Sequence, residues 1–262
     1  MNSIRTIIDK EWAEVFKNRV VLFTITLMPL LLTILPLVVL ATTNSAGTLQ
    51  GDSTDVPLQF AQACGNVSAG DCMQIFLVNQ FLLMFMLLPL AIPVAIAAYS
   101  IVGEKTTRSL EPLLATPITT EQLMVGKGLA AVIPAILATW VGFAIFAAAS
   151  PLVGASAVVT ASIVSPTWLV AILVVGPLMS VMAVNAAIIV SSRTTDPRVA
   201  EQVSMVVIVP LLGLLFGQIA GILVINVQVM LLTALVIGVL DAGLIYAGAR
   251  LFQREAILTK WK

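Results

Sequence analysis

Residues 102–127 read VGEKTTRSLEPLLATPITTEQLMVGK and interrupt an otherwise apolar chain. This charged stretch, rich in Thr and broken by Pro, lies between two long runs, 73–103 and 128–192, that carry no charge. Two further uncharged runs cover 20–51 and 202–240. A helix that crosses a bilayer needs about 20 mostly apolar residues. The runs therefore predict membrane-spanning helices, with the quoted stretch as the connection between two of them.

The composition agrees with a membrane protein. Of the 262 residues, 60% are apolar and 10% are charged, whereas soluble domains average about 45–50% apolar and about 25% charged residues. The first two uncharged runs have room for one span each and the last two for two each. We therefore predict one all-α integral membrane domain over residues 1–262, with six spans near 20–42, 75–101, 128–150, 167–190, 203–225 and 228–249.

The two longest runs must each turn once. A cluster of Pro, Gly and Ser at 150–168 predicts the turn of the third run. The fourth run has less room, and INVQ at 225–228 is the best position, either as a tight outer hairpin or as a shallow re-entrant piece.

The basic residues predict the orientation. In the six-span arrangement every Lys and Arg of the chain lies on one side, which is the pattern of a cytoplasmic face. Both termini are then cytoplasmic, as residues 1–19 and 250–262, together with the connections 103–126 and 193–202. We expect a multi-pass protein of the plasma or inner membrane, surrounded by lipid bilayer.

The one sizeable outer loop, residues 43–74, contains both cysteines of the chain, Cys64 and Cys72. A close pair outside the cell favours a disulfide that closes a small loop. The alternative is two free thiols.

Missing residue types exclude several functions. The chain has no His, which removes Ser–His hydrolases and His-ligated metals, and no G-x-x-x-x-G-K-[ST] phosphate loop. An intramembrane aspartyl protease needs two apposed aspartates, and the spans contain Asp241 alone. We expect no enzyme, no catalytic residue, no metal site, no cofactor bound by this chain and no nucleic-acid partner.

Asp241 is the one ionisable residue deep within a span. Because a buried charge in a membrane is costly, its side chain should face protein or water, or be protonated. It either helps to bind a cation or bonds a neighbouring helix through Asn185 or a Ser.

The N-terminal segment predicts an amphipathic helix. An apolar stripe with a Trp, interrupted by Glu11, is typical of a helix that lies on the membrane surface; its apolar members are Ile4, Ile7, Ile8, Trp12, Val15 and Phe16.

The quoted stretch itself predicts a short amphipathic helix from about Glu104. Glu104 and Arg108 are four residues apart, a favourable pair on a helix, and Leu110, Leu113 and Leu114 form one apolar ridge. Thr116-Pro117 ends it, and TTEQ at 119–122 predicts a capping box that begins the next span. The helix either lies in the lipid headgroups or docks a cytoplasmic partner.

The stretch resembles the characteristic segment of the membrane subunit of type-2 ATP-binding-cassette (ABC) exporters. That pattern has an acidic residue, then Ser/Thr-Leu-Glu, Leu-Leu-x-Thr-Pro and Gly-Lys, which are here Glu104, Ser109-Leu110-Glu111, Leu113-Leu114-Ala115-Thr116-Pro117 and Gly126-Lys127. Arg108 stands in place of the usual Gly, and Ser109 in place of Thr. The ends IRTIIDKEWAEVFKNR and RLFQREAILTKWK resemble the connecting helix of the family and the tail of its sodium- and drug-efflux branch.

The resemblance implies that residues 103–126 form a coupling segment docked in a groove of a separate ATPase subunit. Its implied contact residues are Glu104, Arg108, Ser109, Leu110, Glu111, Leu113, Leu114, Thr116 and Pro117. Residues 193–202 are either a second, smaller contact or an ordinary polar turn, with Arg193, Asp196, Arg198 and Glu201 as the candidate residues.

The implied function is that of a permease subunit of an ATP-driven exporter. Two copies of the ATPase subunit would bind ATP and magnesium, and two permease chains would pair as a homodimer or with a paralogue. The substrate is either a hydrophobic drug or lipid, or the sodium ion. The alternatives are a self-sufficient secondary transporter or channel, and a membrane anchor protein without transport.

Overall fold

The computed structural model describes residues 3–17, 19–45, 57–65, 67–106 and 119–251. These residues form helices and no strand. In chain order the elements are α1 (Ser3–Val15), α2 (Arg19–Ser45), α3 (Leu58–Cys64), α4 (Ala69–Phe85), α5 (Leu88–Thr106), α7 (Thr120–Ala149), the 3₁₀ turn η3 (Ser150–Val153), α8 (Ala157–Ile163), α9 (Pro166–Val170), the π turn η4 (Ala171–Val175), α10 (Gly176–Arg193), α11 (Pro197–Ser204), the 3₁₀ turn η5 (Met205–Ile208), α12 (Val209–Ile219) and α13 (Val227–Leu251).

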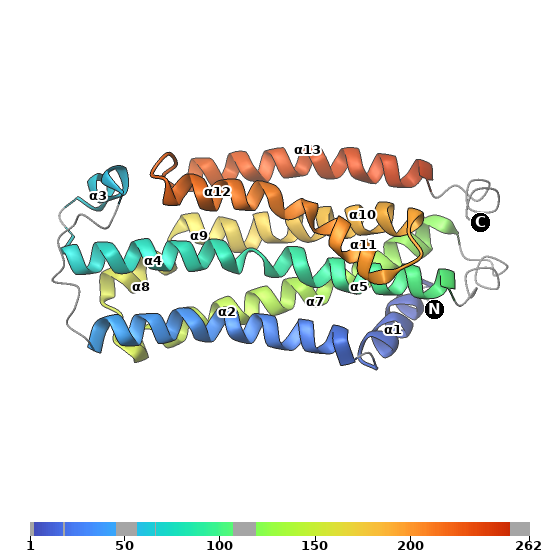
Figure 1. The fold of residues 1–262 in the computed structure, drawn as a ribbon, viewed down its shortest axis with the longest axis horizontal. Coiled ribbons are helices and arrows are strands. Elements are labelled where there is room, and N and C mark those ends of the chain that lie inside the picture. Colours follow the sequence, from blue (N-terminus) through green and yellow to red (C-terminus); the bar gives the residue numbers. More distant parts are fainter. Residues whose placement is uncertain (1–2, 18, 46–56, 66, 107–118, 252–262) are drawn as a thin grey trace.

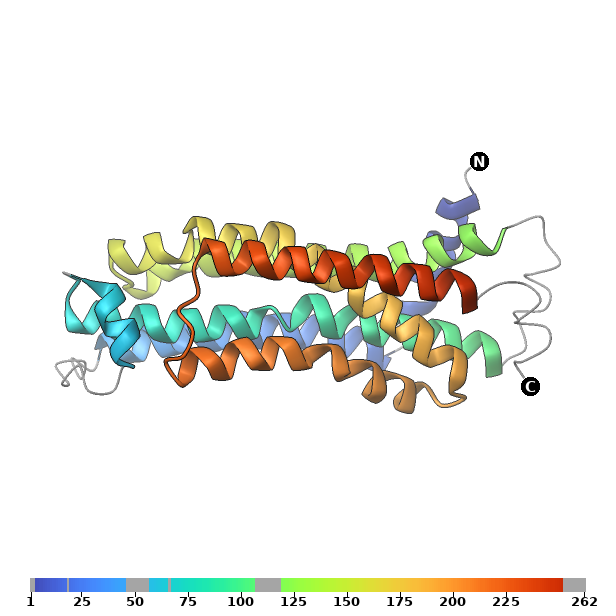
Figure 2. The same cartoon turned by 90° about the horizontal axis from the view of Figure 1, so that it is seen from above.

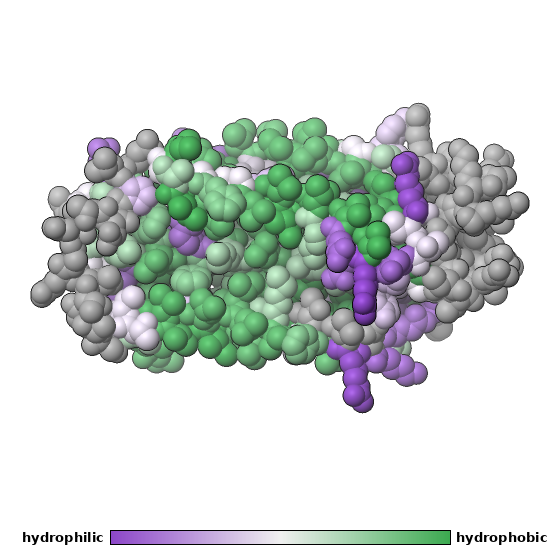
Figure 3. Space-filling model, in the orientation of Figure 1, coloured by the Kyte–Doolittle hydropathy of each residue, from purple (hydrophilic) through white to green (hydrophobic). Residues whose placement is uncertain are grey.

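The described residues contain six helical stretches that are long and apolar enough to cross a membrane, as predicted. They are Val21–Thr43, Ala69–Glu104, Glu121–Val153, Ala157–Arg193, Pro197–Ile219 and Val227–Gly248. The stretches run side by side in an elongated bundle (Figures 1 and 2). Apolar side chains cover its middle, and hydrophilic ones gather toward the end that carries α1 and α11 (Figure 3). The protein is thus an all-α, six-span membrane protein; we name its two ends the α1 end and the α3 end.

Span 2, made of α4 and α5, is the centre of the bundle. In this span 83% of the most apolar window is buried, against 18–22% in spans 1, 5 and 6. The α5 half packs against α7, α10 and α11, and the α4 half against α2, α8 and α12. Spans 1, 5 and 6 therefore form the periphery, with most of their apolar side chains turned outward.

Span 2 is broken near its middle, between α4 and α5. The N–H groups of Met86 and Leu87 donate to the oxygens three residues earlier, Leu83 and Met84, rather than four. Pro89, which has no N–H, is the second residue of α5. The hydrophobic pattern alone does not reveal this break, because both halves are apolar.

Span 4 is irregular at a neighbouring position, where the π turn η4 ends at Val175 and α10 begins at Gly176. A Cβ atom at Gly176 would lie 3.9 Å from Cγ of Pro89, so the two irregular regions are in contact. Trp140 of α7 donates its Nε1–H to the carbonyl oxygen of Ile172 at 3.1 Å. This bond engages a carbonyl within the π turn.

Two connections can be compared with the predictions. The third run turns at Gly154 (φ 92°), inside the predicted 150–168 region. The turn of the fourth run begins earlier than predicted: α12 ends at Ile219 rather than near residue 225, and the turn occupies 220–226, which overlaps the predicted 225–228 at its end. Gly221 (φ 71°) permits this early stop, since only glycine adopts that backbone conformation without strain.

Candidate functional site

The central part of the 102–127 stretch lies outside the described residues. This covers Arg108, Ser109, Leu110, Glu111, Leu113, Leu114, Thr116 and Pro117. The structure describes how both flanks of that part are held. The flanks belong to the span helices, since α5 continues through Thr106 and α7 begins at Thr120. The prediction that a separate helix begins at about Glu104 is therefore wrong, because this residue lies in the last turn of α5.

The flank on α7 begins with the predicted capping box. The side-chain oxygen of Thr119 accepts a hydrogen bond from the N–H of Gln122 at 3.2 Å, and Gln122 Oε1 accepts one from the N–H of Thr119 at 3.3 Å. Two N–H groups that have no partner within the helix are thereby satisfied. This prediction from TTEQ is confirmed.

Helix α1 packs on the same flank. Ile7 and Val15 of its apolar stripe are buried, and a Cβ atom at Gly126 would lie 2.8 Å from Cγ2 of Ile7. Glycine at 126 therefore allows α1 and α7 to approach closely. Trp12 donates its Nε1–H to the carbonyl oxygen of Ala130 at 3.0 Å. The predicted N-terminal helix is present, but its stripe packs on protein rather than resting on the membrane surface alone.

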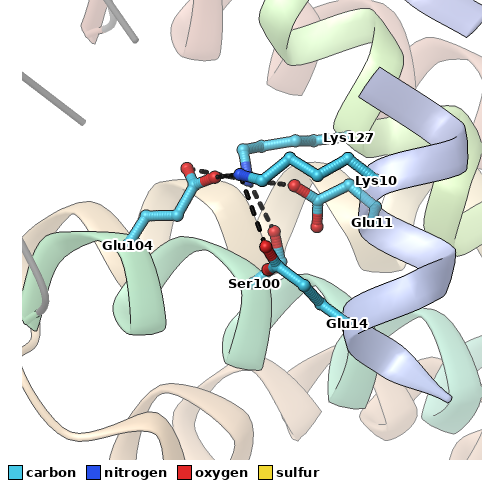
Figure 4. Close-up of polar contacts among 6 residues, drawn as sticks. All are labelled: Lys10, Glu11, Glu14, Ser100, Glu104 and Lys127. Atoms are coloured by element: carbon cyan, nitrogen blue, oxygen red, sulfur yellow. Dashed lines mark hydrogen bonds and ion pairs between the residues drawn. The ribbon is translucent and has the colours of Figure 1, made fainter. Parts of the chain in front are cut away.

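A buried ion network joins α1 to both flanks (Figure 4). Nζ of Lys127 on α7 lies 2.6 Å from Oε1 of Glu11 on α1 and 2.9 Å from Oε2 of Glu104 on α5. It also donates to Oγ of Ser100 at 2.7 Å. The side chains of Lys127, Glu11 and Glu104 are 4%, 2% and 5% exposed. One ammonium group thus connects three helices.

Lys10 extends the network toward solvent. Its Nζ lies 2.6 Å from Oε1 of Glu104 and 3.6 Å from Oε1 of Glu14. Burial lowers the pKa of Lys10, but the hydrogen bond to Glu104 and the charges of the three nearby glutamates outweigh it and raise the pKa overall. The contribution of Lys10 to stability is therefore fully present below the ordinary lysine pKa and is lost only as pH rises through the raised value.

The network fixes geometry more than it adds net stability. Taking charged groups out of water offsets much of their attraction, yet removing one partner of a buried pair costs about 3–5 kcal/mol, because the other charge is stranded. The ends of α5 and α7 are therefore held together, with α1 as the third member.

Comparison with known families fits this arrangement of six spans around a polar connection. A family model described as ABC-2 family transporter protein matches residues 5–248. The chain belongs to this family. Membership of this family identifies the chain as the non-catalytic permease component of an ABC transporter, a multi-pass membrane protein for which the family implies an ABC ATPase as partner. No curated protein matches the chain significantly.

Sequence reasoning found the members of the network without their connection. In the sequence, Glu104 and Lys127 belong to the family-like pattern, and Glu11 is an interruption of an apolar stripe. The permease brings Glu11 to Lys127, which lies 116 positions later in the sequence, and so to Glu104. The available signal was Glu11 itself, because an acidic residue on the buried stripe of a helix needs a basic partner.

The second predicted contact region lies at the same end. Arg193 ends α10, and Asp196 caps α11 through a hydrogen bond from the N–H of Arg198 to Oδ1 at 2.8 Å. Helix α11, which includes Glu201, packs against α5 and α10. The region is thus the capped start of α11, which packs against α5, the helix that contains Glu104. Its contact with a partner stays a prediction.

Asp241 and Asn185 are not joined by a hydrogen bond. Asp241 is 5% exposed on the buried side of α13, with Met230 and Ile237, and neither of its oxygens has a hydrogen-bond partner among the described residues. Asn185 donates its Nδ2–H to the carbonyl oxygen of Val181 in its own helix. The structure thus brings no described donor to Asp241.

A disulfide joins Cys64 and Cys72, with Cα atoms 5.8 Å apart. It fastens α3 to the start of α4, where the rings of Phe60 and Phe76 also meet edge to face at 5.1 Å. Pro57, just before α3, reaches the turn between spans 5 and 6, since a Cβ atom at Gly221 would lie 3.0 Å from Cβ of Pro57. The short helix α3 thus lies against the outer part of both α4 and that turn.

Proposed function

We propose that the permease is the membrane subunit of an ATP-driven exporter and that residues 103–117 dock in its ATPase subunit. The observation that carries the proposal is the buried network of Lys127, Glu11 and Glu104, which fastens both flanks of this segment to α1. Such a fastening suits a connection that passes motion from a partner into the spans. The distribution of basic residues supports a cytoplasmic location for the α1 end and for both termini.

In the proposed mechanism, two ATPase subunits bind ATP and magnesium and close on each other. Each presses on a docked segment through Leu110, Leu113 and Leu114, with Arg108 and Glu111 setting its orientation. The ends of α5 and α7 move together with α1, because Lys127 bonds to both Glu11 and Glu104. Spans 2 and 3 therefore receive the motion as one unit.

The substrate pathway is proposed to form between two permease chains, as a homodimer or with a paralogue. The outward apolar side chains of spans 1, 5 and 6 provide surface for a second chain and for lipid. The substrate is a hydrophobic drug or lipid, or the sodium ion, as in the sodium- and drug-efflux branch. If Asp241 takes part in transport, Asp241→Asn reduces coupled transport while assembly is retained; wild-type transport by this variant would contradict an essential charge.

The test is purification from the native host in mild detergent, with the bound proteins identified and counted. We expect an equimolar P-loop ATPase that is lost on Leu113→Asp or Glu111→Lys. Glu121→Lys, an identical charge change in the first turn of α7, is the control and should retain it. Purification without an ATPase, or retention in all variants, would favour the alternative of a self-sufficient transporter.

A further inference from the structure

Gln218 carries a buried amide that no described residue satisfies. Together with Leu211 and Leu215 it forms the buried side of α12, and the long helix on which α12 packs is α4. The residue is 1% exposed, and within the described part of the chain neither its amide nitrogen nor its amide oxygen has a hydrogen-bond partner. Such a group lowers stability unless something else satisfies it.

Gln80 of α4 is partly buried as a residue, but both of its amide atoms are shielded from solvent. Neither atom has a hydrogen-bond partner among the residues that the structure describes. Gln80 is four residues after Phe76 and therefore lies on the same side of α4, one turn closer to the middle of the bundle. Phe76 packs against Phe60 of α3. Gln80 is thus one helical turn further into the bundle than the contact with α3.

Helix α3 lies at the end of the bundle next to Gln80 and Gln218. Figure 1 shows it beyond the ends of α12 and α13, beside the start of α4. Pro57 contacts the turn at Gly221, three residues after Gln218. The disulfide between Cys64 and Cys72 keeps α3 in this position. Two unpartnered amides thus lie on packed helices, under a covalently fastened cap.

The chemistry of the pair limits what it binds. Each carboxamide offers two donor hydrogens and one acceptor oxygen. Neither α4 after Asp71 nor α12 contains a charged residue. A neutral group that both donates and accepts, such as a hydroxyl or an amide, satisfies both side chains, and the leucines around Gln218 favour an apolar body.

We propose that Gln80 and Gln218 bind the uncharged, hydrogen-bonding head of an amphipathic molecule between α4 and α12. The proposal rests on the proposed function and names its substrate class: neutral amphiphiles rather than cations.

The test measures binding to the full-length permease alone, in phosphatidylcholine nanodiscs, with tritiated octyl β-glucoside as the probe and empty nanodiscs as the blank. We expect saturable binding that weakens about tenfold in Gln80→Met and in Gln218→Met, a loss of about 1.4 kcal/mol. Octyltrimethylammonium, with the same chain and a charged head, should compete at least about tenfold less well than unlabelled glucoside. Gln202→Met, a glutamine exposed on α11, is the matched control and should bind as wild type.

Thermal unfolding of the same variants separates binding from packing. Gln218→Met should unfold at a higher temperature, because methionine of similar shape removes an unpartnered polar group. The proposal is overturned if no binding exceeds the blank, if both variants bind as wild type, or if Gln218→Met loses binding and thermal stability together. The binding assay contains no ATPase, so a negative result in it leaves the coupling proposal intact. If the probe binds but purification from the native host yields no ATPase, the coupling proposal alone is contradicted.

Discussion

Lys127→Met should release α1 from the bundle. The substitution removes the ammonium group that lies 2.6 Å from Glu11 and 2.9 Å from Glu104, and it strands two carboxylates that are 2% and 5% exposed. Removing one partner of a buried ion pair costs about 3–5 kcal/mol. Glu104 keeps Lys10, so the larger loss falls on Glu11 and therefore on α1.

Amide hydrogen exchange converts this cost into a measurable factor. Helix α1 has 13 residues, and an isolated helix of that length is marginal in water. Its protection therefore comes from docking, and a loss of about 3–5 kcal/mol should accelerate exchange of its amides by a factor between about 100 and a few thousand.

A control variant and a rescue variant test whether the loss of protection in α1 comes from the stranded charge. Lys17→Met changes an exposed lysine just after α1 and should leave exchange unaltered. Adding Glu11→Gln to Lys127→Met removes a stranded charge and should recover part of the protection. Exchange of α1 within a factor of three of wild type in Lys127→Met would refute the claim that this network holds the helix.

Three further predictions concern the packing around the network and the cap. Gly126→Ala should weaken the docking of α1 by about 1–3 kcal/mol, because Cβ would lie 2.8 Å from Cγ2 of Ile7; exchange of α1 reports the loss, and Gly126→Ala combined with Ile7→Ala should lose less protection than the two single changes added together, whereas strict additivity would contradict the contact. Thr119→Ala should cost about 1 kcal/mol and accelerate exchange at the start of α7 roughly fivefold, whereas an unchanged rate would mean that the capping box is not formed. Gly221→Ala should loosen α3, because of the positive φ and the contact with Pro57, and speed reduction of the disulfide by dithiothreitol; Gly213→Ala, with open space around its Cβ position, is the control, and equal rates in both would contradict the contact.

The sequence predicts the six spans because charge is scarce in them. An uncharged run of the right length has few stable alternatives to a spanning helix, so the six stretches follow from the pattern of Lys, Arg, Asp and Glu. The capping box at Thr119 and Gln122 is equally local, since the bonding residues are three apart. Such features need no knowledge of the packing.

Features that depend on contacts between distant residues were not predictable. The break after Phe85 and the π turn at 171–175 lie in apolar sequence, and only their contact through Pro89 and Gly176 indicates a common role. The early end of span 5 depends on Gly221, which the hydrophobic pattern does not distinguish from the apolar residues around it. The pairing of Glu11 with Lys127 likewise requires the position of α1 on α7.

The most direct test of coupling is amide exchange of the complete permease–ATPase complex, compared between its ATP-bound and ADP-bound states. The account predicts that exchange changes in α1 and in residues 103–106 and 120–127 together, and that Lys127→Met keeps the change in α7 while abolishing it in α1. A stable complex in which these regions exchange identically in both nucleotide states would contradict the account.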